Sequence, residues 1–365
     1  MATWGRALCA LFVVLTVFCV AVAPAAARPD PDGVVVEGLT DPRGIAAAGG
    51  RALLVAESGN GKITRIEPRR NGAPRVTTFA AFPFDPEAGP SPVEVAYQGP
   101  NHVWVTLAGD PAAGGGRVVR LDRKGRTTLS VDIAGYQATD PDEDDQDDFP
   151  EESNPFGLAV LPGGGVLVAD SAGNDVLRID RRRKIATVAR FLREDVPWPD
   201  VELPFPSPPP GTPTPAESVP TAVAIGPDGA WYVSELKGFP FVKGTSRIWR
   251  IEPGAENAVC DPKNPSTGKC TPYATGFTSV IDLAFGRDGT MYVLEIVKEG
   301  LLGVELLGEP PIGALWAVEG GSKTELVPGT LMAPGGVAVG HNGSLSVTTG
   351  TVFGPGGGAV VRVNP

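Results

Sequence analysis

A repeated pattern is the feature that most constrains the fold of this chain. Six segments each contain an apolar stretch, a glycine-rich turn and a second apolar stretch that ends in a polar or acidic residue. Their first residues, called the anchors here, are spaced 50, 63, 65, 60 and 54 positions apart. The anchors are Gly44, Glu94, Gly157, Ala222, Asp282 and Gly336. Two positions after each anchor stands an alanine, namely Ala46, Ala96, Ala159, Ala224, Ala284 and Ala338. A repeat of this length predicts an array of similar structural units.

Each repeat supplies four short stretches that are typical of antiparallel strands, called A to D in chain order. Stretches A and B flank the glycine-rich turn, and five of the six repeats continue with a stretch C of the type apolar, any residue, Arg, apolar. A fourth stretch follows in most repeats. The chain has 48 Gly and 38 Pro, which a periodic sequence places in the turns between strands. The sequence therefore predicts an all-β fold, a six-bladed β-propeller with four strands in each blade.

The two ends of the repeat array complement each other. The last repeat ends at Pro365 after three strands, whereas the stretch from Val34 to Gly38 is a strand without a blade. We expect this N-terminal strand to join the last blade and to close the ring, which would remove exposed strand edges. We also expect the recurring alanines to lie nearest the propeller axis, where a larger side chain would collide.

The first 27 residues have the pattern of a signal peptide. Arg6 precedes an apolar run from Ala7 to Val22, and the small residues Ala25 to Ala27 form a typical cleavage site. The run is too short to predict a stable membrane span. We therefore expect residues 1–27 to be removed and residues 28–365 to form a single propeller domain, secreted to the extracellular space or the cell envelope.

Two cysteines remain after such a cleavage, Cys260 and Cys270. An exported chain with two cysteines most simply forms one disulfide. The two residues flank the hairpin from Gly254 to Lys269, so we expect the disulfide to act as a clasp on that hairpin.

Net charge and histidine content exclude several classes of function. The chain has 42 acidic and 31 basic side chains, a formal charge of −11, and this sign disfavours nucleic acid as a partner. It has only two histidines, His102 and His341, which disfavours most zinc, haem and histidine-dependent triad chemistry. Both lie in A-to-B turns. The chemistry that remains is mainly that of carboxylates.

Carboxylates recur at one position of the repeat. Thirteen residues after the anchor, four of the six repeats have an acid, namely Glu57, Asp170, Glu235 and Glu295. In a four-stranded meander the end of strand B lies on the side of the D-to-A and B-to-C connections, where most of the long insertions fall. These acids, together with Arg43, are therefore candidates for a ligand-binding face. Alternatively, each carboxylate accepts hydrogen bonds from the turns of its own or the neighbouring blade.

A second set of oxygen-bearing residues lies at the ends of the A strands. Glu94, Asn154 and Asp282 are candidate metal ligands there, and carboxylate and amide oxygens suit Ca²⁺ better than a transition metal. Calcium is thus a possible cofactor of this chain.

Two family resemblances follow from particular segments. PFGLAVLPGGGVLVADSAGNDVLRID, from Pro155 to Asp180, resembles the NHL repeat of six-bladed propellers. The signal peptide, the opening GLTDPRGIA, the SELKGFPF segment at Ser234 and the closing repeat resemble the secreted bacterial ScyD/ScyE family. That resemblance implies export and a propeller, and it implies no particular reaction.

The chain is also similar in organisation to calcium-dependent lactonases of the gluconolactonase type. These hold their metal with one Glu, two Asn and one Asp at axial strand ends, and Glu94, Asn154 and Asp282 match three of those roles. Thr221 or Ala222 stands where the other amide is expected. Quinoprotein sugar dehydrogenases share the propeller too, but the histidines here lie away from the face that would need a general base.

The sequence therefore favours a secreted, non-catalytic propeller, either a binding protein or a scaffold. Its expected partner is a small molecule, a cell-wall component or an extracellular protein. The alternative is a calcium-dependent lactonase or esterase, in which the metal polarises a carbonyl group. A purely structural envelope protein is a third possibility.

Overall fold

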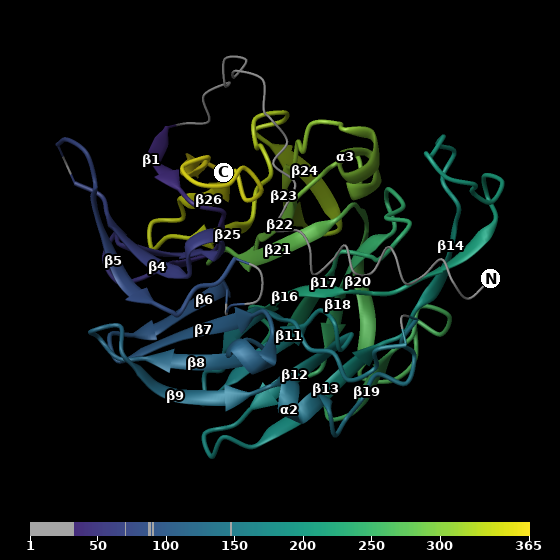
Figure 1. The fold of residues 1–365 in the computed structure, drawn as a ribbon, viewed down its shortest axis with the longest axis horizontal. Coiled ribbons are helices and arrows are strands. Elements are labelled where there is room, and N and C mark those ends of the chain that lie inside the picture. The colour runs from purple at the N-terminus through teal and green to yellow at the C-terminus, as the bar shows by residue number, and fades with distance from the viewer. Residues whose placement is uncertain (1–32, 70, 87–88, 90, 147) are drawn as a thin grey trace. The chain divides into compact units, whose positions relative to one another are not determined.

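The fold is that of a β-propeller with six blades, and nearly all of its regular structure is β-strand (Figure 1). A computed structural model describes residues 33–365 except 70, 87–88, 90 and 147. The predicted signal peptide lies outside the described residues. No helix among the described residues is long and apolar enough to cross a membrane. The described chain divides into two compact units: a terminal unit, which runs up to Phe156 and resumes at Pro334–Pro365, and a central unit, Gly157–Ala333.

The terminal unit contains three blades, each a four-stranded sheet. The first is β2 (Pro42–Ala47), β3 (Leu53–Glu57), β4 (Lys62–Glu67) and β5 (Arg75–Ala81). The second is β6 (Ser91–Gly99), β7 (His102–Ala108), β8 (Arg117–Leu121) and β9 (Thr127–Asp132), followed by the short helix α2 (Ala134–Gln137). The third is β25 (Gly336–Val339), β26 (Leu345–Thr349), β27 (Gly358–Val363) and β1 (Val34–Leu39).

The N-terminal strand β1 is therefore the fourth strand of the last blade. It runs antiparallel to β27, with Val34 opposite Val361 and Glu37 opposite Ala359. Strands from the two ends of the chain thus share one sheet. That this pairing also closes a ring stays a prediction.

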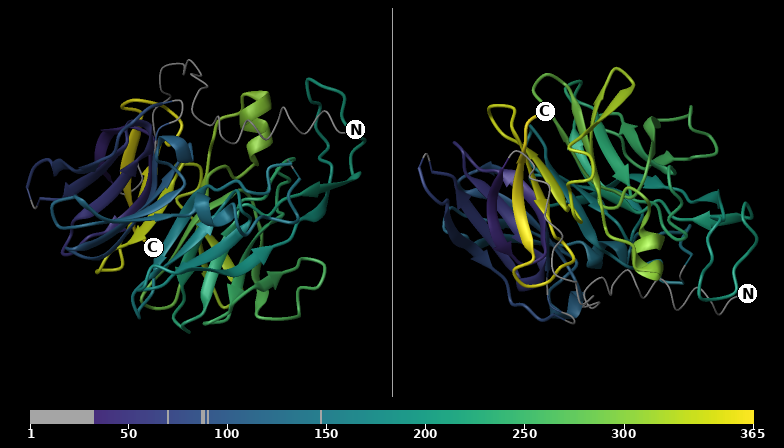
Figure 2. Two further views of the ribbon diagram at one scale, coloured as in Figure 1. Left: turned by 60° about the horizontal axis from the view of Figure 1, so that its bottom comes forward. Right: turned by 90° about the horizontal axis from the view of Figure 1, so that it is seen from above.

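The central unit contains the other three blades. The first is β10 (Pro155–Val160), β11 (Val166–Asp170), β12 (Asp175–Ile179) and β13 (Ile185–Phe191), although Pro155 and Phe156 at the start of β10 belong to the terminal unit. The second is β16 (Pro220–Ile225), β17 (Trp231–Glu235), β18 (Ser246–Ile251) and β20 (Cys270–Phe277). The third is β21 (Val280–Phe285), β22 (Met291–Glu295), β23 (Ala314–Glu319) and β24 (Ser322–Leu326). A hairpin of β14 (Glu194–Pro197) and β15 (Pro213–Ala216) and the helix α3 (Leu301–Leu307) lie on the same side of this unit (Figure 2).

Strand B is the buried centre of each blade. Every residue of β3, β11, β17 and β22 is buried. The apolar residues on strands of adjacent blades form continuous clusters, for example Leu54, Val95, Val105 and Val119 in the terminal unit. This packing fixes the positions at which the B strands end, and the candidate carboxylates stand there.

A strands approach each other closely at the glycine anchors. A Cβ atom on Gly157 would lie 2.6 Å from the Cα of Ala222, and one on Gly336 would lie 2.8 Å from the carbonyl oxygen of Arg43. Glycine at these anchors is what permits the close approach. Among the recurring alanines, Ala159 and Ala338 are buried and Ala46 and Ala224 are half-buried. That a larger side chain would collide at the alanines stays a prediction.

The disulfide between Cys260 and Cys270 is present, with Cα atoms 5.0 Å apart. Its setting differs from a clasp on a simple hairpin. Residues Ala258–Cys260 form β19, which runs parallel to β13 and becomes the fifth strand of the neighbouring blade. Because β20 belongs to the next blade, the disulfide connects the outer strands of two adjacent blades.

Candidate functional site

The four repeated acids are buried, and the structure shows what holds Glu57. Its carboxylate accepts hydrogen bonds from the backbone N–H of Thr40 (2.8 Å), the side-chain amide of Asn60 (3.0 Å) and the hydroxyl of Thr64. The next residue, Ser58, donates its N–H to the carbonyl of Asp41 at 3.1 Å. Asp41 has a left-handed φ of 43°. The acid thus fastens a sharp corner between the D-to-A connection and strand B.

The same corner recurs in two blades of the central unit with the same sequence spacing. Glu235 accepts from the hydroxyl of Ser218 at 2.6 Å, and Glu295 accepts from the N–H of Thr278 at 2.7 Å. In each corner, as at Thr40 and Glu57, the donor precedes the acid by 17 residues. The residues after these donors, Val219 and Ser279, have φ values of 55° and 48°. This repetition gives a structural reason for the acid at the end of strand B.

Asp170, the fourth acid, is fully buried and accepts from the N–H of Gly173 at 3.2 Å. All four acids therefore hold backbone or side-chain donors of their own blades, as the alternative interpretation expected. Glu57 lies in the terminal unit, whereas Asp170, Glu235 and Glu295 lie in the central unit. A ligand-binding role for the four together stays a prediction.

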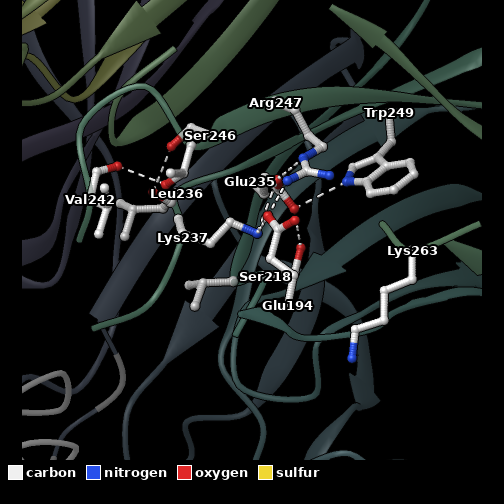
Figure 3. A network of polar contacts seen from close by, with 12 residues as sticks. Glu194, Ser218, Glu235, Leu236, Lys237, Val242, Ser246, Arg247, Trp249 and Lys263 are labelled. Atoms are coloured by element: carbon white, nitrogen blue, oxygen red, sulfur yellow. Dashed lines mark hydrogen bonds and ion pairs between the residues drawn. The ribbon is translucent and has the colours of Figure 1, made fainter. Parts of the chain in front are cut away.

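Glu235 is also the centre of a cluster of four charges, in which Glu235 and Lys237 are buried and Glu194 and Arg247 are half-buried (Figure 3). The Nζ of Lys237 lies 3.2 Å from Glu235 Oε1 and 2.8 Å from Glu194 Oε1. Arg247 places its Nε 2.7 Å from Glu235 Oε1 and also pairs with Glu194. The indole N–H of Trp249 donates to Glu235 Oε2 at 3.1 Å. We call Glu194, Glu235, Lys237 and Arg247 the charge cluster.

Mutual pairing governs the electrostatics of the charge cluster. Burial alone would raise the pKa of Glu194, but Lys237 and Arg247 outweigh it and hold that pKa below its usual value. Burial alone would lower the pKa of Arg247, but Glu235 and Glu194 outweigh it and raise that pKa. The two acids and two bases therefore neutralise each other, which is what allows the side chain of Lys237 to be 1% exposed.

The charge cluster joins four separate segments of the central unit. Glu194 lies on the β14–β15 hairpin, Lys237 in the B-to-C loop after β17 and Arg247 on β18, while Ser218 comes from the D-to-A connection. The B-to-C loop is further tied to that connection by backbone bonds from Leu236 to Val219 and from Lys237 to Ser218. Residues that are far apart in sequence are thus held together by one set of ion pairs and hydrogen bonds, which we call the loop base.

The same segments also carry a group of aromatic rings. Trp198, just after β14, meets Phe239 of the B-to-C loop edge to face, with ring centroids 5.6 Å apart. Phe239 meets Phe241 at 5.9 Å in the same geometry. Phe239 is half-buried, whereas Trp198 and Phe241 are buried. Phe239 is therefore the ring of this group that is most open to a ligand.

Glu295 differs from Glu235 because no cation among the described residues pairs with it directly. Burial raises the pKa of Glu295 to about 7, against smaller lowering effects of Trp316, the Thr278 N–H, Lys323 and Lys298. The two lysine ammonium groups instead lie over the ring of Trp316, with Nζ 4.9 and 5.4 Å from its centroid. Their partners are the carbonyl of Gly276 for Lys323 and Glu325 for Lys298.

Arg43 occupies the end of strand A in the first blade. Its Nε donates to Ser58 Oγ at 3.0 Å, and its guanidinium lies over the ring of Phe156, 5.9 Å from the centroid. Burial lowers the pKa of Arg43, and the carboxylate of Asp41 opposes this only in part. The candidate ligand-face residue Arg43 is thus half-buried with little charge compensation.

The candidate metal ligands are distributed over both units. Glu94 and Asn154 lie in the terminal unit and Asp282 lies in the central unit. Glu94 Oε1 accepts from the N–H of Val95 and Asp282 Oδ1 accepts from the N–H of Leu283, so each carboxylate bonds to its own strand. Among the described residues, no group of three or more His, Cys, Asp and Glu side chains is arranged to hold a metal ion. A calcium site stays a prediction.

Sequence reasoning missed three members of the charge cluster. It singled out Glu235 but not Glu194, Lys237 or Arg247. The SELKGFPF segment did contain a signal, because a lysine two residues after a strand-terminal acid, in a loop rich in Gly, Pro and Phe, suggests a buried pair. Glu194 lies 41 positions before Glu235 and carries no repeat signal.

Comparisons with known proteins agree on the fold. No protein-family model matches this chain, and no curated protein matches it. A PQQ-bound aldose sugar dehydrogenase from Streptomyces coelicolor has a TM-score of 0.55 at 18% identity, covering 93% of this chain and 99% of the other. An oxidoreductase described as a glucose dehydrogenase from Thermus thermophilus has a TM-score of 0.52 at 21% identity, covering 90% and 98%. A streptogramin B lyase has a TM-score of 0.51 at 14% identity, covering 91% and 95%. At these identities the likeness extends to the propeller fold alone.

Proposed function

We propose that this chain is a secreted β-propeller that binds an extracellular small molecule or cell-wall component through the loops of its central unit. The observation that carries the proposal is the charge cluster, which fixes the β14–β15 hairpin, the D-to-A connection and the B-to-C loop on one buried base. Loops that are already ordered lose little conformational freedom when a ligand binds, so more of the contact energy appears as affinity. The half-buried ring of Phe239 lies in the same B-to-C loop as Lys237.

A binding role fits the chemistry of the charge cluster better than catalysis does. A general acid or base needs a pKa near the working pH and access to its substrate. In the charge cluster each ion is paired with an ion of opposite sign, and these pairs hold the pKa of Glu194 lowered and that of Arg247 raised. The two histidines of the chain are exposed in or beside A-to-B turns. The resemblance of GLTDPRGIA and SELKGFPF to the ScyD/ScyE family supports export, because that family is secreted.

Cosedimentation tests this proposal. The protein from Arg28 to Pro365 is mixed with insoluble peptidoglycan sacculi, and the bound fraction is measured against protein concentration. We expect saturable binding that falls about tenfold in affinity for Phe239→Ala, since deletion of a central aromatic contact typically has an effect of this size. Val76→Ala serves as the matched control, because Val76 is an exposed apolar residue on the outer strand β5.

Two results would contradict the binding proposal. One is the absence of saturable binding to sacculi, and the other is equal binding by the Phe239→Ala and Val76→Ala variants. The alternative, a calcium-dependent lactonase or esterase, is tested in parallel by equilibrium dialysis against Ca²⁺ and by turnover of a simple lactone. Stoichiometric calcium together with turnover would replace a binding function by hydrolysis.

A further inference from the structure

Arg43 is an arginine whose hydrogen-bonding capacity is mostly unused. It stands on β2, and its backbone is fixed because the hydroxyl of Thr348 donates to its carbonyl at 2.6 Å. Its Nε is occupied by Ser58 Oγ, and that hydroxyl in turn donates to the carbonyl of Asp41 at 2.9 Å. Among the described residues, neither Nη group has a hydrogen-bond or ion-pair partner, although the two groups carry four N–H donors.

The guanidinium is held in one orientation in spite of these free donors. One of its faces lies over the Phe156 ring, and Phe156 is itself held by a bond from Thr106 Oγ1 to its carbonyl at 3.0 Å. The Phe156 ring and the hydrogen bond from Nε to Ser58 Oγ together fix the orientation of the guanidinium group. Arg43 is half-buried, and its Nη atoms are not among the fully buried polar atoms without partners. The free edge of the fork is therefore open to a small molecule.

The positive charge of Arg43 lacks a matched negative charge. Asp41 is the carboxylate that opposes the desolvation of Arg43, yet no ion pair forms between the two. Asp41 Oδ1 instead accepts the N–H of Gly354 at 2.8 Å, and burial raises the pKa of Asp41. A partly buried charge with so little compensation destabilises the folded protein unless an anion binds to it.

We infer that Arg43 is an anion-binding residue that receives a carboxylate or phosphate group of a small molecule through its two free Nη groups. A planar guanidinium presents parallel N–H bonds that match two oxygens of either group, and charge-assisted pairs of this kind are strong. This site lies in the terminal unit, so it goes beyond the loop site proposed above and does not depend on it. The oriented fork, the stacked ring and the missing counter-charge all favour the same class of ligand.

Anion titrations with named probes test the inference. The protein from Arg28 to Pro365 is titrated with sodium phosphate and with sodium acetate, each at ionic strength held constant with sodium chloride, and binding is followed by calorimetry and by melting temperature. Comparison of the phosphate and acetate titrations shows whether Arg43 receives a phosphate or a carboxylate group. We expect one of them to bind and to raise the melting temperature, whereas chloride does neither.

Variants assign the binding to Arg43. We expect Arg43→Met to weaken anion binding at least tenfold, roughly the effect of losing a charge-assisted hydrogen bond. Arg43→Lys keeps the charge and loses the fork, so it should bind more weakly than the native protein. Arg120→Met is the matched control, because Arg120 also lies over an aromatic ring, that of Trp104 at 5.6 Å, and bonds to a hydroxyl through Nε.

The outcomes are distinct. Without anion, Arg43→Met should melt no lower than the native protein, because it removes an uncompensated buried charge, whereas a purely structural arginine would lower the melting temperature of that variant. The inference is overturned if phosphate and acetate act no differently from chloride, or if Arg43→Met binds them as the native protein does. If Arg43→Met does not fold, unchanged binding by Arg43→Lys overturns it equally. Peptidoglycan binding lost in Phe239→Ala but retained in Arg43→Met would leave the loop proposal intact.

Discussion

Arg43 in the terminal unit and Arg247 in the central unit are both withdrawn from water, but their surroundings differ. Arg247 touches two carboxylates, Glu235 and Glu194, and its pKa is raised. Arg43 pairs with none among the described residues, and its pKa is lowered by burial. Both side chains also lie over aromatic rings, Phe156 and Trp249. The comparison teaches that burial alone does not describe the environment of an arginine, and that the balance of charge around it has to be considered as well.

Removing Arg247 should have the largest effect on stability. Arg247→Met leaves Glu235 and Glu194 with Lys237 as their remaining cation, so one buried negative charge is uncompensated. We expect the free energy of unfolding to fall by about 3 to 5 kcal/mol, measured by urea denaturation. Arg120→Met should change it by less than about 1 kcal/mol, because Arg120 is half-exposed and forms no comparable pair. A loss below about 1 kcal/mol for Arg247→Met would show that the charge cluster is not what stabilises the loop base.

Two acids at the ends of B strands, Glu235 and Glu295, can be compared in the same way as the two arginines. Glu235 is paired with Lys237 and Arg247, whereas Glu295 has no direct cation and a pKa of about 7, raised by burial. In the unfolded chain the pKa of Glu295 is near the ordinary value of 4.5 for a glutamate. The folded state therefore holds this proton more tightly, so the stabilising contribution of Glu295 is fully present below about pH 4.5 and is lost as the pH rises through about 7.

Glu295→Gln should remove this pH dependence. Relative to the native protein, we expect the variant to gain stability between pH 4.5 and pH 8 by about 3 kcal/mol, the free energy that corresponds to the shift in pKa. The amide oxygen of Gln can still accept the N–H of Thr278, so the corner is preserved. Urea denaturation of both proteins at a series of pH values measures the difference. Parallel stability curves for the two proteins would mean that Glu295 titrates normally in the folded state.

The features that the sequence predicted are those that the repeat makes visible. The spacing of the anchors located six blades, and the acid thirteen residues after each anchor marked the end of strand B. Cys260 and Cys270 were paired correctly, because two cysteines leave one choice. The stretch at Val34 was identified as a strand because the last repeat lacked one.

What the sequence could not show depends on contacts that do not repeat. Glu194 reaches Lys237 only because the β14–β15 hairpin folds back, and β19 joins β13 by a parallel pairing that no local pattern encodes. The close approach of A strands at the anchor glycines was not predicted either, because the crowding was assigned to the alanines two positions further along the chain. The free Nη groups of Arg43 could not be seen either, since a missing partner is a property of three-dimensional packing.

The disulfide gives a smaller test of how the central unit is held together. Cys260 lies on β19, whose Ala258 is opposite Ala189 of β13, and Cys270 begins β20 of the next blade. Ten residues separate the cysteines, so the loop that they close in the unfolded chain is short, and we expect the Cys260→Ala/Cys270→Ala variant to lose roughly 2 to 3 kcal/mol of unfolding free energy. A reducing agent should destabilise the native protein by a similar amount and leave this variant unchanged. If this variant lost as much unfolding free energy as Arg247→Met, the disulfide would stabilise the central unit as much as the charge cluster does. The predicted order of the two effects would then be wrong.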